Sequence, residues 1–126
     1  MIGYVTVGTN DFEKSVVFYD TLFTVIGARR FMEEETFIAW AVTPDQPAFS
    51  VTRPFDGKPA TVGNGMMIAL AADSNEVVDA VYAKAIEMGG SDEGPPGQRM
   101  DGFYAAYFRD LDGNKLNIFH HWTPGS

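Results

Sequence analysis

The sequence predicts an α+β fold in which two βαβββ modules form curved mixed sheets around a cleft. The first observation is an internal repeat, since residues 4–27 align with residues 67–90 without a gap, at a constant offset of 63 positions. The second is that both copies keep one order of features: a strand-like segment, a helix-capping pattern, an amphipathic helix and a glycine. Repeated units of this kind bury their apolar faces together, so we expect eight strands and two helices around a shared core.

The first module, residues 1–54, is expected to contain one helix and four strands. Its opening segment alternates and is β-branched, which is typical of a strand. Asn10 and Glu13 match a capping box, so we expect Asn10 to cap a helix that ends at Gly27. Two later strands are expected to form a hairpin around the acidic run Glu33–Glu35. The expected strands cover residues 2–8, 28–33, 36–43 and 48–54.

A linker rich in Gly and Pro, residues 55–65, leads to the second module, residues 66–126. Asp73 and Glu76 repeat the capping box, and a Gly-Gly pair ends the helix that follows. The segment SDEGPPGQRMDG, residues 91–102, is interpreted as a flexible loop near the mouth of the cleft. Three strand patterns are visible in this module, at residues 66–72, 103–109 and 115–121, and the repeated βαβββ order implies a fourth.

Composition restricts the class of protein. The 126 residues suffice for one domain with its own core, and hydrophobic content of 45% argues against disorder. With no cysteine, disulfides and thiolate metal sites are excluded. A net charge of −8 disfavours nucleic acid and anionic membranes as partners. No signal-peptide pattern or membrane-length apolar run is present, so we expect a cytoplasmic protein.

Two sequence motifs accompany the repeated modules: the opening VTVGTNDFEKSVVFYD and the closing D-x-D-G-N-x-L. Together they resemble the vicinal oxygen chelate superfamily, which holds glyoxalase I, extradiol dioxygenases, fosfomycin-resistance enzymes and bleomycin-resistance binding proteins. The resemblance covers the whole chain and implies a glyoxalase-like fold. It also implies a homodimer, since sequestering members of the family often bind ligands at a dimer interface. Because one fold hosts unrelated chemistry, the resemblance leaves the activity open.

Enzymes of this family commonly hold one divalent metal with His, Glu or Gln side chains on equivalent strands of both modules. Tyr4, Met67 and Asn117 occupy three of the corresponding positions, and Ser50 or Val51 occupies the fourth. Methionine prefers soft metals, tyrosine binds as a phenolate, and a neutral Asn carbonyl carries no charge to hold a divalent ion. The resemblance therefore implies no metal site and no cofactor in this chain.

The only two histidines, His120 and His121, are adjacent on the last expected strand. Adjacent strand residues point to opposite faces, so the pair is not expected to chelate one ion. His121 shares a strand face with Asn117 and Phe119. It lies two residues, roughly 7 Å, beyond Phe119, which places it close to the cleft rim. It is a candidate ligand contact or proton donor; alternatively, the pair only caps the sheet edge beside Trp122.

The expected cleft lining is aromatic and thioether-rich with few polar groups, which favours a planar or apolar small molecule. Two alternatives stay open: Arg53 is only a surface charge on an edge strand, or the side chains fill the cleft and leave no site. The candidate ligand-binding residues are Tyr4, Thr6, Trp40, Arg53, Met67, Tyr107, Asn117, Phe119 and His121.

Three functions remain for this sequence. The leading hypothesis is a metal-independent protein that binds a small molecule, with aromatic compounds as candidates. The alternative is a lyase or dioxygenase of glyoxalase type, lactoylglutathione lyase-like, with an atypical metal site or with Tyr4 or His121 as acid or base. The third is a subunit that only pairs with other proteins through its sheets. No catalytic residue is assigned, since nothing tunes the acids Asp92, Glu93 and Asp101 in the expected loop.

Overall fold

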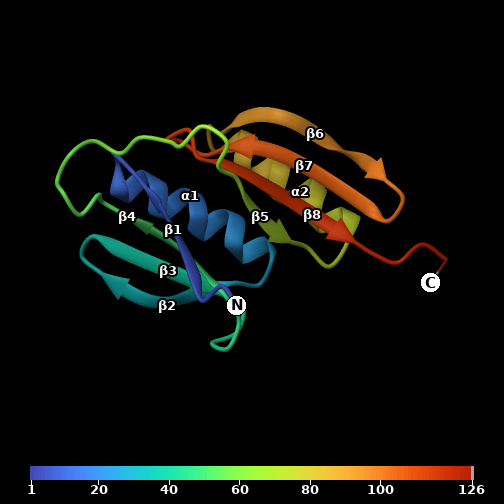
Figure 1. Ribbon diagram of the computed structural model, residues 1–126, viewed down its shortest axis with the longest axis horizontal. Helices are drawn as coiled ribbons and strands as arrows, with labels where there is room; N and C mark the ends of the chain where they lie inside the picture. The colour runs from blue at the N-terminus through green and yellow to red at the C-terminus, as the bar shows by residue number, and fades with distance from the viewer. Residues whose placement is uncertain (126) are drawn as a thin grey trace.

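The computed structural model describes residues 1–125, which fold into two βαβββ modules (Figure 1). This arrangement confirms the predicted α+β fold class. The first module contains β1 (Tyr4–Gly8), α1 (Phe12–Val25), β2 (Arg29–Glu34), β3 (Phe37–Ala41) and β4 (Ala48–Thr52). The second contains β5 (Ile68–Ala71), α2 (Asn75–Glu87), β6 (Ser91–Met100), β7 (Phe103–Arg109) and β8 (Lys115–His121). Neither helix is long and apolar enough to cross a membrane within the described part of the chain.

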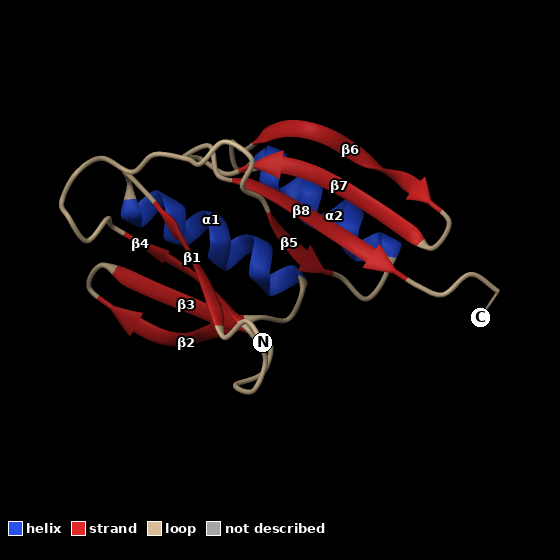
Figure 2. Ribbon diagram, viewed as in Figure 1, coloured by secondary structure: helices blue, strands red, loops and turns tan. Residues whose placement is uncertain are grey.

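Each module forms one four-stranded mixed sheet. The strand orders are β1-β4-β3-β2 and β5-β8-β7-β6, so the two sheets share one topology. In both, the first strand pairs in parallel with the last strand of its module, and the other pairs are antiparallel. In Figure 2, β1 crosses in front of α1, β7 and β8 lie in front of α2, and the two helices contact each other.

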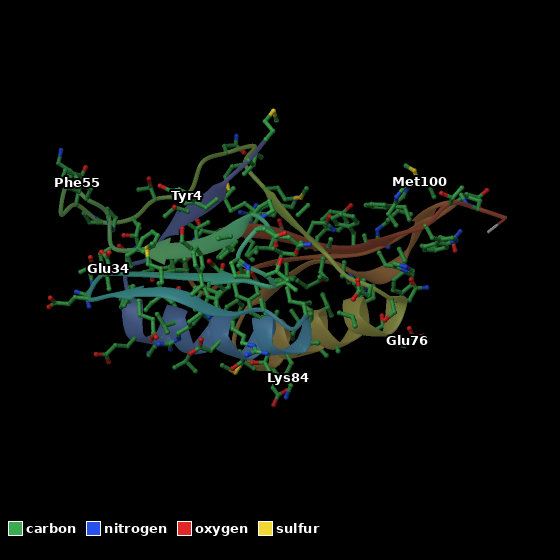
Figure 3. All side chains as sticks on the ribbon, turned by 90° about the horizontal axis from the view of Figure 1, so that it is seen from below. Tyr4, Glu34, Phe55, Glu76, Lys84 and Met100 are labelled. Carbon is green, nitrogen blue, oxygen red and sulfur yellow. The ribbon has the colours of Figure 1, made fainter. Side chains whose placement is uncertain are left out.

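The helices cover one side of the sheets and leave the other side open. Figure 3 shows α1 and α2 along one side, with Tyr4 projecting from the opposite side and Lys84 on the outer face of α2. We call the side away from the helices the open face of each sheet. The two open faces lie side by side in one chain and do not pack against each other.

The helix starts differ from the predicted caps by one residue in each module. Asp11, not Asn10, caps α1 by accepting from Lys14 N at 3.2 Å, and Ser74, not Asp73, caps α2. Asn10 is used elsewhere, because its side chain pairs with the backbone N–H and carbonyl of Ala60 at 2.7 and 3.1 Å. The predicted helix caps are therefore wrong by one position, and the side chain of Asn10 fastens the linker.

Residues 91–102 were expected to form a flexible loop, and that expectation is wrong. Residues 91–100 form β6, an edge strand paired antiparallel with β7 through three register shifts. Proline lacks an N–H donor and glycine weakens a regular strand, but both are tolerated at a sheet edge with bulges. The Gly-Pro-Pro-Gly composition of β6 therefore reflects its place at the edge.

One hydrophobic core spans both modules. The first helix supplies large side chains, with Phe18, Tyr19 and Leu22 each 0% exposed. The second helix supplies the smaller Val78 and Ala85, also 0% exposed. Both sets belong to the same cluster of buried residues, so the modules share their apolar interior across the contact between the helices.

A buried polar cluster also joins the modules. Tyr19 of α1 donates its hydroxyl hydrogen to Asp110 Oδ2 at 2.5 Å, in the turn between β7 and β8. The same carboxylate accepts from Asn114 N and Nδ2, both at 2.9 Å. Asn114 Nδ2 in turn donates to the carbonyl of Gly8 at 3.1 Å. Residues 110–114 of the second module are thus bonded to the β1–α1 region of the first.

Burial sets the protonation behaviour of this cluster. Desolvation raises the pKa of Asp110, although the hydrogen bonds from Tyr19 and Asn114 act in the opposite direction. Burial, followed by the charge of Asp110, raises the pKa of Tyr19 well above its usual value. Tyr19 therefore remains a neutral donor.

Candidate functional site

The open face of the second sheet brings four predicted ligand-binding residues together: Tyr107, Asn117, Phe119 and His121. Strand register fixes their arrangement, because Tyr107 pairs with Asn117, Ala105 with Phe119 and Phe103 with His121. The rings of Phe103 and Phe119 stack at 5.5 Å between centroids, with 22° between planes. The face thus carries an aromatic surface beside a polar amide.

Asn117 is buried although it lies on this face. Its side-chain Nδ2 donates to the carbonyl of Ala106 at 3.0 Å, and the residue is 3% exposed. Within the described residues no buried side-chain nitrogen or oxygen lacks a partner. The amide is therefore held by backbone of its own sheet and forms a fixed polar point between the aromatic side chains.

The first sheet places Tyr4 and Thr6 on its own open face. Tyr4 is 65% exposed (Figure 3), and Thr6 Oγ1 lies 2.7 Å from Ser50 Oγ. Ser50 also donates to the carbonyl of Val5 at 2.7 Å, whereas Val51 is 0% exposed in the core. Of the two positions left open on the fourth strand, Ser50 therefore lies on the open face.

Trp40 and Arg53 do not lie on an open face, so that part of the expectation is wrong, but each lines one of the two hollows described below. Alternation along β3 turns Trp40 toward α1, where its Nε1 donates to Asp20 Oδ1 at 2.8 Å. The indole is 2% exposed and belongs to the core. Arg53 follows β4, and its guanidinium lies 5.7 Å from the ring centroid of Phe12. The structure therefore separates both residues from Tyr107 and Asn117.

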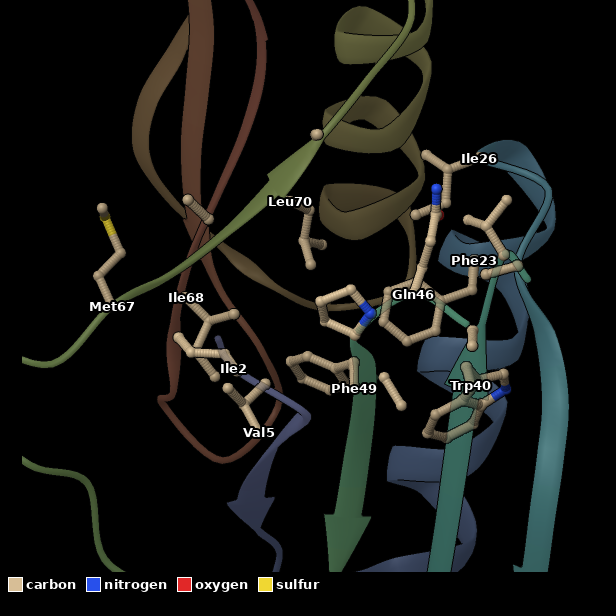
Figure 4. A pocket seen from close by; sticks show the side chains of 17 residues that line it. Ile2, Val5, Phe23, Ile26, Trp40, Gln46, Phe49, Met67, Ile68 and Leu70 are labelled. Carbon is tan, nitrogen blue, oxygen red and sulfur yellow. The ribbon is translucent and has the colours of Figure 1, made fainter. Parts of the chain in front are cut away.

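Met67 lies between the two modules, immediately before β5. It is 44% exposed and lines a hollow of about 470 Å³ at the junction of the modules. Figure 4 shows Ile68 and Leu70 of β5 pointing toward Phe49 across this hollow. Its lining side chains are apolar apart from Gln46, so the hollow offers space but few groups for orienting a ligand.

A second hollow, of about 630 Å³, lies beside the linker and includes Arg53, Thr52 and Lys58. Tyr107, Asn117 and Phe119 line neither hollow. The predicted ligand-binding residues of the second sheet therefore lie on the open face, outside both of these hollows.

The residues at the family's metal positions do not fit a divalent ion. The side chains present are the phenol of Tyr4, the thioether of Met67, the hydroxyl of Ser50 and the amide of Asn117. The Nδ2 of Asn117 is bonded to the backbone, and its remaining Oδ1 is neutral and carries no charge to hold a divalent ion. In the described part of the chain, no three His, Cys, Asp or Glu side chains are grouped so that they could hold an ion. No chemical step is therefore assigned to a metal.

The two histidines lie on opposite sides of β8, as strand alternation predicts. His120 faces α2, where Nδ1 lies 2.9 Å from Asn75 Oδ1 and the ring stacks on Trp122 at 5.0 Å. His121 is exposed on the open face, 6.5 Å from the ring of Phe103. His120 thus packs beside Trp122 at the edge of the sheet, whereas His121 lies where a ligand on the open face could contact it.

Three further side chains on this face were not among the predicted binding residues: Phe103, Arg99 and Lys115. The guanidinium of Arg99 and the ammonium of Lys115 lie 5.6 and 5.8 Å from the ring centroid of Tyr107. Lys115 could have been found from alternation, since it lies two residues before Asn117. Arg99 could not, because its segment had the composition of a loop.

Comparison with known proteins agrees with the architecture. Residues 1–118 match the model of the Glyoxalase/Bleomycin resistance protein/Dioxygenase superfamily. The chain is similar to the crystal structure of a glyoxalase/bleomycin resistance protein from Albidiferax ferrireducens T118. The two share 41% identity and a TM-score of 0.89, over 97% of this chain and 99% of that one. A search of curated proteins found no match.

Two more distant structures show the fold alone. A glyoxalase/bleomycin resistance protein/dioxygenase family enzyme from Burkholderia phytofirmans PsJN is 18% identical, with a TM-score of 0.73 over 95% of this chain and 98% of that one. Lactoylglutathione lyase from Agrobacterium tumefaciens is 16% identical, with a TM-score of 0.67 over 94% of this chain and 92% of that one.

Proposed function

Because the chain belongs to the glyoxalase/bleomycin resistance protein/dioxygenase superfamily, we propose that it is a metal-independent protein that binds a small planar molecule. The binding surface is the open face of the second sheet. The observation that carries the proposal is the stacked pair of Phe103 and Phe119 beside the fixed amide of Asn117. Aromatic side chains supply a large apolar contact area, and one oriented polar group supplies specificity.

The chemistry of the side chains supports metal independence. A catalytic metal needs ligands that offer charge or a strong lone pair, and it needs them on both modules in this family. Tyr4, Met67 and Asn117 offer neither in a form suited to a borderline divalent ion. The proposal therefore assigns binding, and no bond-breaking step, to these three positions.

Exposed apolar side chains support a homodimer. In one chain Tyr4 is 65% exposed, and Met32 and Met67 are each 44% exposed. Tyr4 and Met32 lie on opposite edge strands of the first sheet and Met67 lies at the start of the second, so a cover for all three spans both open faces. A second copy related by two-fold symmetry would cover the open faces, and it would turn each of them into one wall of a cleft. The ligand site is then completed by the partner copy.

The alternative function is a lyase or dioxygenase of glyoxalase type that uses an atypical metal site or no metal. It is favoured by one observation: the phenol of Tyr4 and the imidazole of His121 are both exposed on open faces, where each could transfer a proton. In this alternative the same cleft is used, and His121 or Tyr4 acts as acid or base.

Elemental analysis of protein purified without a histidine tag separates the two functions. The binding protein is expected to carry only substoichiometric metal, and stoichiometric, tightly held Zn, Ni, Mn or Fe would contradict it. Light scattering coupled to size exclusion tests the dimer, which is expected at twice the 13.8 kDa chain mass.

A thermal-shift screen of aromatic compounds tests the site. A ligand that binds the native state raises the midpoint of unfolding. The shift is expected to be lost in Phe119→Ala and kept in Ile86→Ala, a matched apolar truncation of a partly exposed side chain on α2. Equal shifts in both variants would place the ligand elsewhere.

A further inference from the structure

Two cations converge on one ring of the proposed site. The chain has nine Lys and Arg residues against 17 acids, so positive charge is scarce. Even so, Arg99 Cζ and Lys115 Nζ both lie within 6 Å of the Tyr107 ring centroid, at 5.6 and 5.8 Å. Among the described residues, neither is within 4 Å of a carboxylate, whereas Arg109 beside them pairs with Glu93 at 3.1 Å. The two cations are thus left available.

The backbone of β6 holds the guanidinium of Arg99 in position. Its Nη2 donates to the carbonyl of Pro95 at 2.6 Å, so the side chain folds back along its own strand. A Cβ added at Gly97 would lie 2.8 Å from Arg99 Nη1, and one at Gly94 would lie 3.4 Å from Nη2. The two glycines therefore leave the space that the guanidinium fills. Its position is held by the strand, and its remaining N–H groups have no acceptor in the described chain.

Along β7 and β8, the open face of the second sheet changes from charged side chains at one end to apolar side chains further along. Successive paired rows along β7 and β8 are Arg109 with Lys115, Tyr107 with Asn117, then Ala105 with Phe119. The row of Phe119 lies two residues from the row of Tyr107, roughly 7 Å along the strands. This spacing matches a carboxylate joined to one or two fused aromatic rings. A molecule of that shape could contact the cations and the Phe103–Phe119 pair together.

We propose that the ligand is a planar aromatic carboxylate, bound with its anionic group between Arg99 and Lys115 and its rings on Phe103 and Phe119. This inference rests on the proposed function of the same face. The two cations come from the strands on either side of β7, so an anion bound beside the Tyr107 ring meets positive charge from both sides. Arginine also matches the planar geometry of a carboxylate with two parallel N–H donors.

Naphthalene-2-carboxylate and its neutral amide form the test pair, measured by isothermal titration with the full chain. The carboxylate is expected to bind roughly tenfold more tightly than the amide, the difference typical of one charge-assisted hydrogen bond. Raising the salt concentration is expected to weaken the binding of the carboxylate and to leave the binding of the amide unchanged. Arg99→Gln and Lys115→Gln are each expected to remove this preference, while Lys84→Gln on the outer face of α2 keeps it.

Gly97→Ala provides a variant that retains every charge. Its Cβ displaces the Arg99 guanidinium, so a several-fold loss of carboxylate affinity with unchanged amide affinity is expected. Equal affinity for carboxylate and amide, or an unchanged preference in Arg99→Gln and Lys115→Gln, would overturn the anion inference and leave the proposed planar-molecule site in place. If the wild-type chain binds neither compound and Phe119→Ala changes no ligand response, both proposals fail.

Discussion

Tyr19 and Tyr82 occupy equivalent positions of the two modules and have opposite environments. Tyr19 of α1 is 0% exposed, and its hydroxyl bonds to Asp110 of the other module at 2.5 Å. Tyr82 of α2 is only partly buried, and its hydroxyl bonds to Asp92 of its own module at 2.9 Å. One tyrosine thus joins the modules, whereas the other fastens β6 to the neighbouring helix.

The two modules therefore have the same secondary-structure elements but contribute different side chains to the contact that joins them. The aromatic side chains of α1 cluster tightly, with Tyr19 and Phe49 at 4.7 Å and Phe23 and Trp40 at 5.3 Å between ring centroids. The second helix contributes smaller side chains to the same core. The first module therefore supplies most of the buried aromatic volume, and the D-L-D-G-N turn of the second module supplies the buried acceptor.

The largest expected effect comes from Asp110→Ala. The substitution leaves the Tyr19 hydroxyl and the donors of Asn114 buried without an acceptor. Because buried unpaired donors are costly, the free energy of unfolding is expected to fall by about 3 kcal/mol. Urea denaturation followed by fluorescence measures the change, and a loss below about 1 kcal/mol would mean that water replaces the lost acceptor.

A pair of conservative substitutions sharpens the comparison between the tyrosines. Tyr19→Phe removes a buried hydrogen bond and is expected to cost about 1 to 2 kcal/mol. Tyr82→Phe removes a solvent-accessible bond and is expected to cost about 0.5 kcal/mol or less. Equal losses in the two variants would show that the two modules depend on their tyrosines alike.

Alkaline pH is expected to separate the same two residues. The pKa of Tyr19 is raised well above 10.0 in the folded state by burial, so the folded chain keeps a proton that the unfolded chain releases. The stability due to Tyr19 is therefore fully present below about pH 10 and is lost as pH rises further, by up to about 1.4 kcal/mol per pH unit. The pKa of Tyr82 is also raised, by desolvation and by Asp92, but less strongly. Tyr19→Phe is therefore expected to lose most of this slope and Tyr82→Phe to keep most of it. Urea midpoints collected from about pH 9 to 11 measure it.

The repeated pattern was enough to predict the fold, because strand, helix and glycine recur at a fixed offset and in one order. It was not enough to orient β3. The sequence FIAWA is apolar at every position, so alternation alone could not decide whether Trp40 or Ala39 faces α1. The packing of Trp40 against Phe23 and its bond to Asp20 decide it, and both are tertiary.

Only part of the candidate site was predicted, because the sequence indicates the register of β8 and does not indicate the pairing of β6. The last strand has a clear register after its turn, so Asn117, Phe119 and His121 were placed on one face correctly. Residues 91–100 look like a loop by composition, and their pairing with β7 depends on bulges that local sequence does not reveal. Arg99 was therefore missed. The partner of Tyr19 was missed as well, since Asp110 is 91 residues away along the chain.

The smallest expected difference between the modules comes from the helix caps, where the two modules are alike. Asp11 Oδ1 accepts from Lys14 N and Ser74 Oγ accepts from Val77 N, each at 3.2 Å, at positions related by the repeat. Asp11→Ala and Ser74→Ala are each expected to cost about 1 kcal/mol, as for N-caps in general. Urea denaturation of both variants measures whether the costs are equal. A larger loss at Asp11 alone would mean that the contact between the modules also stabilises the start of α1. The backbone N–H of Asn10, next to this cap, donates to Asp112 Oδ1 of the second module at 2.8 Å.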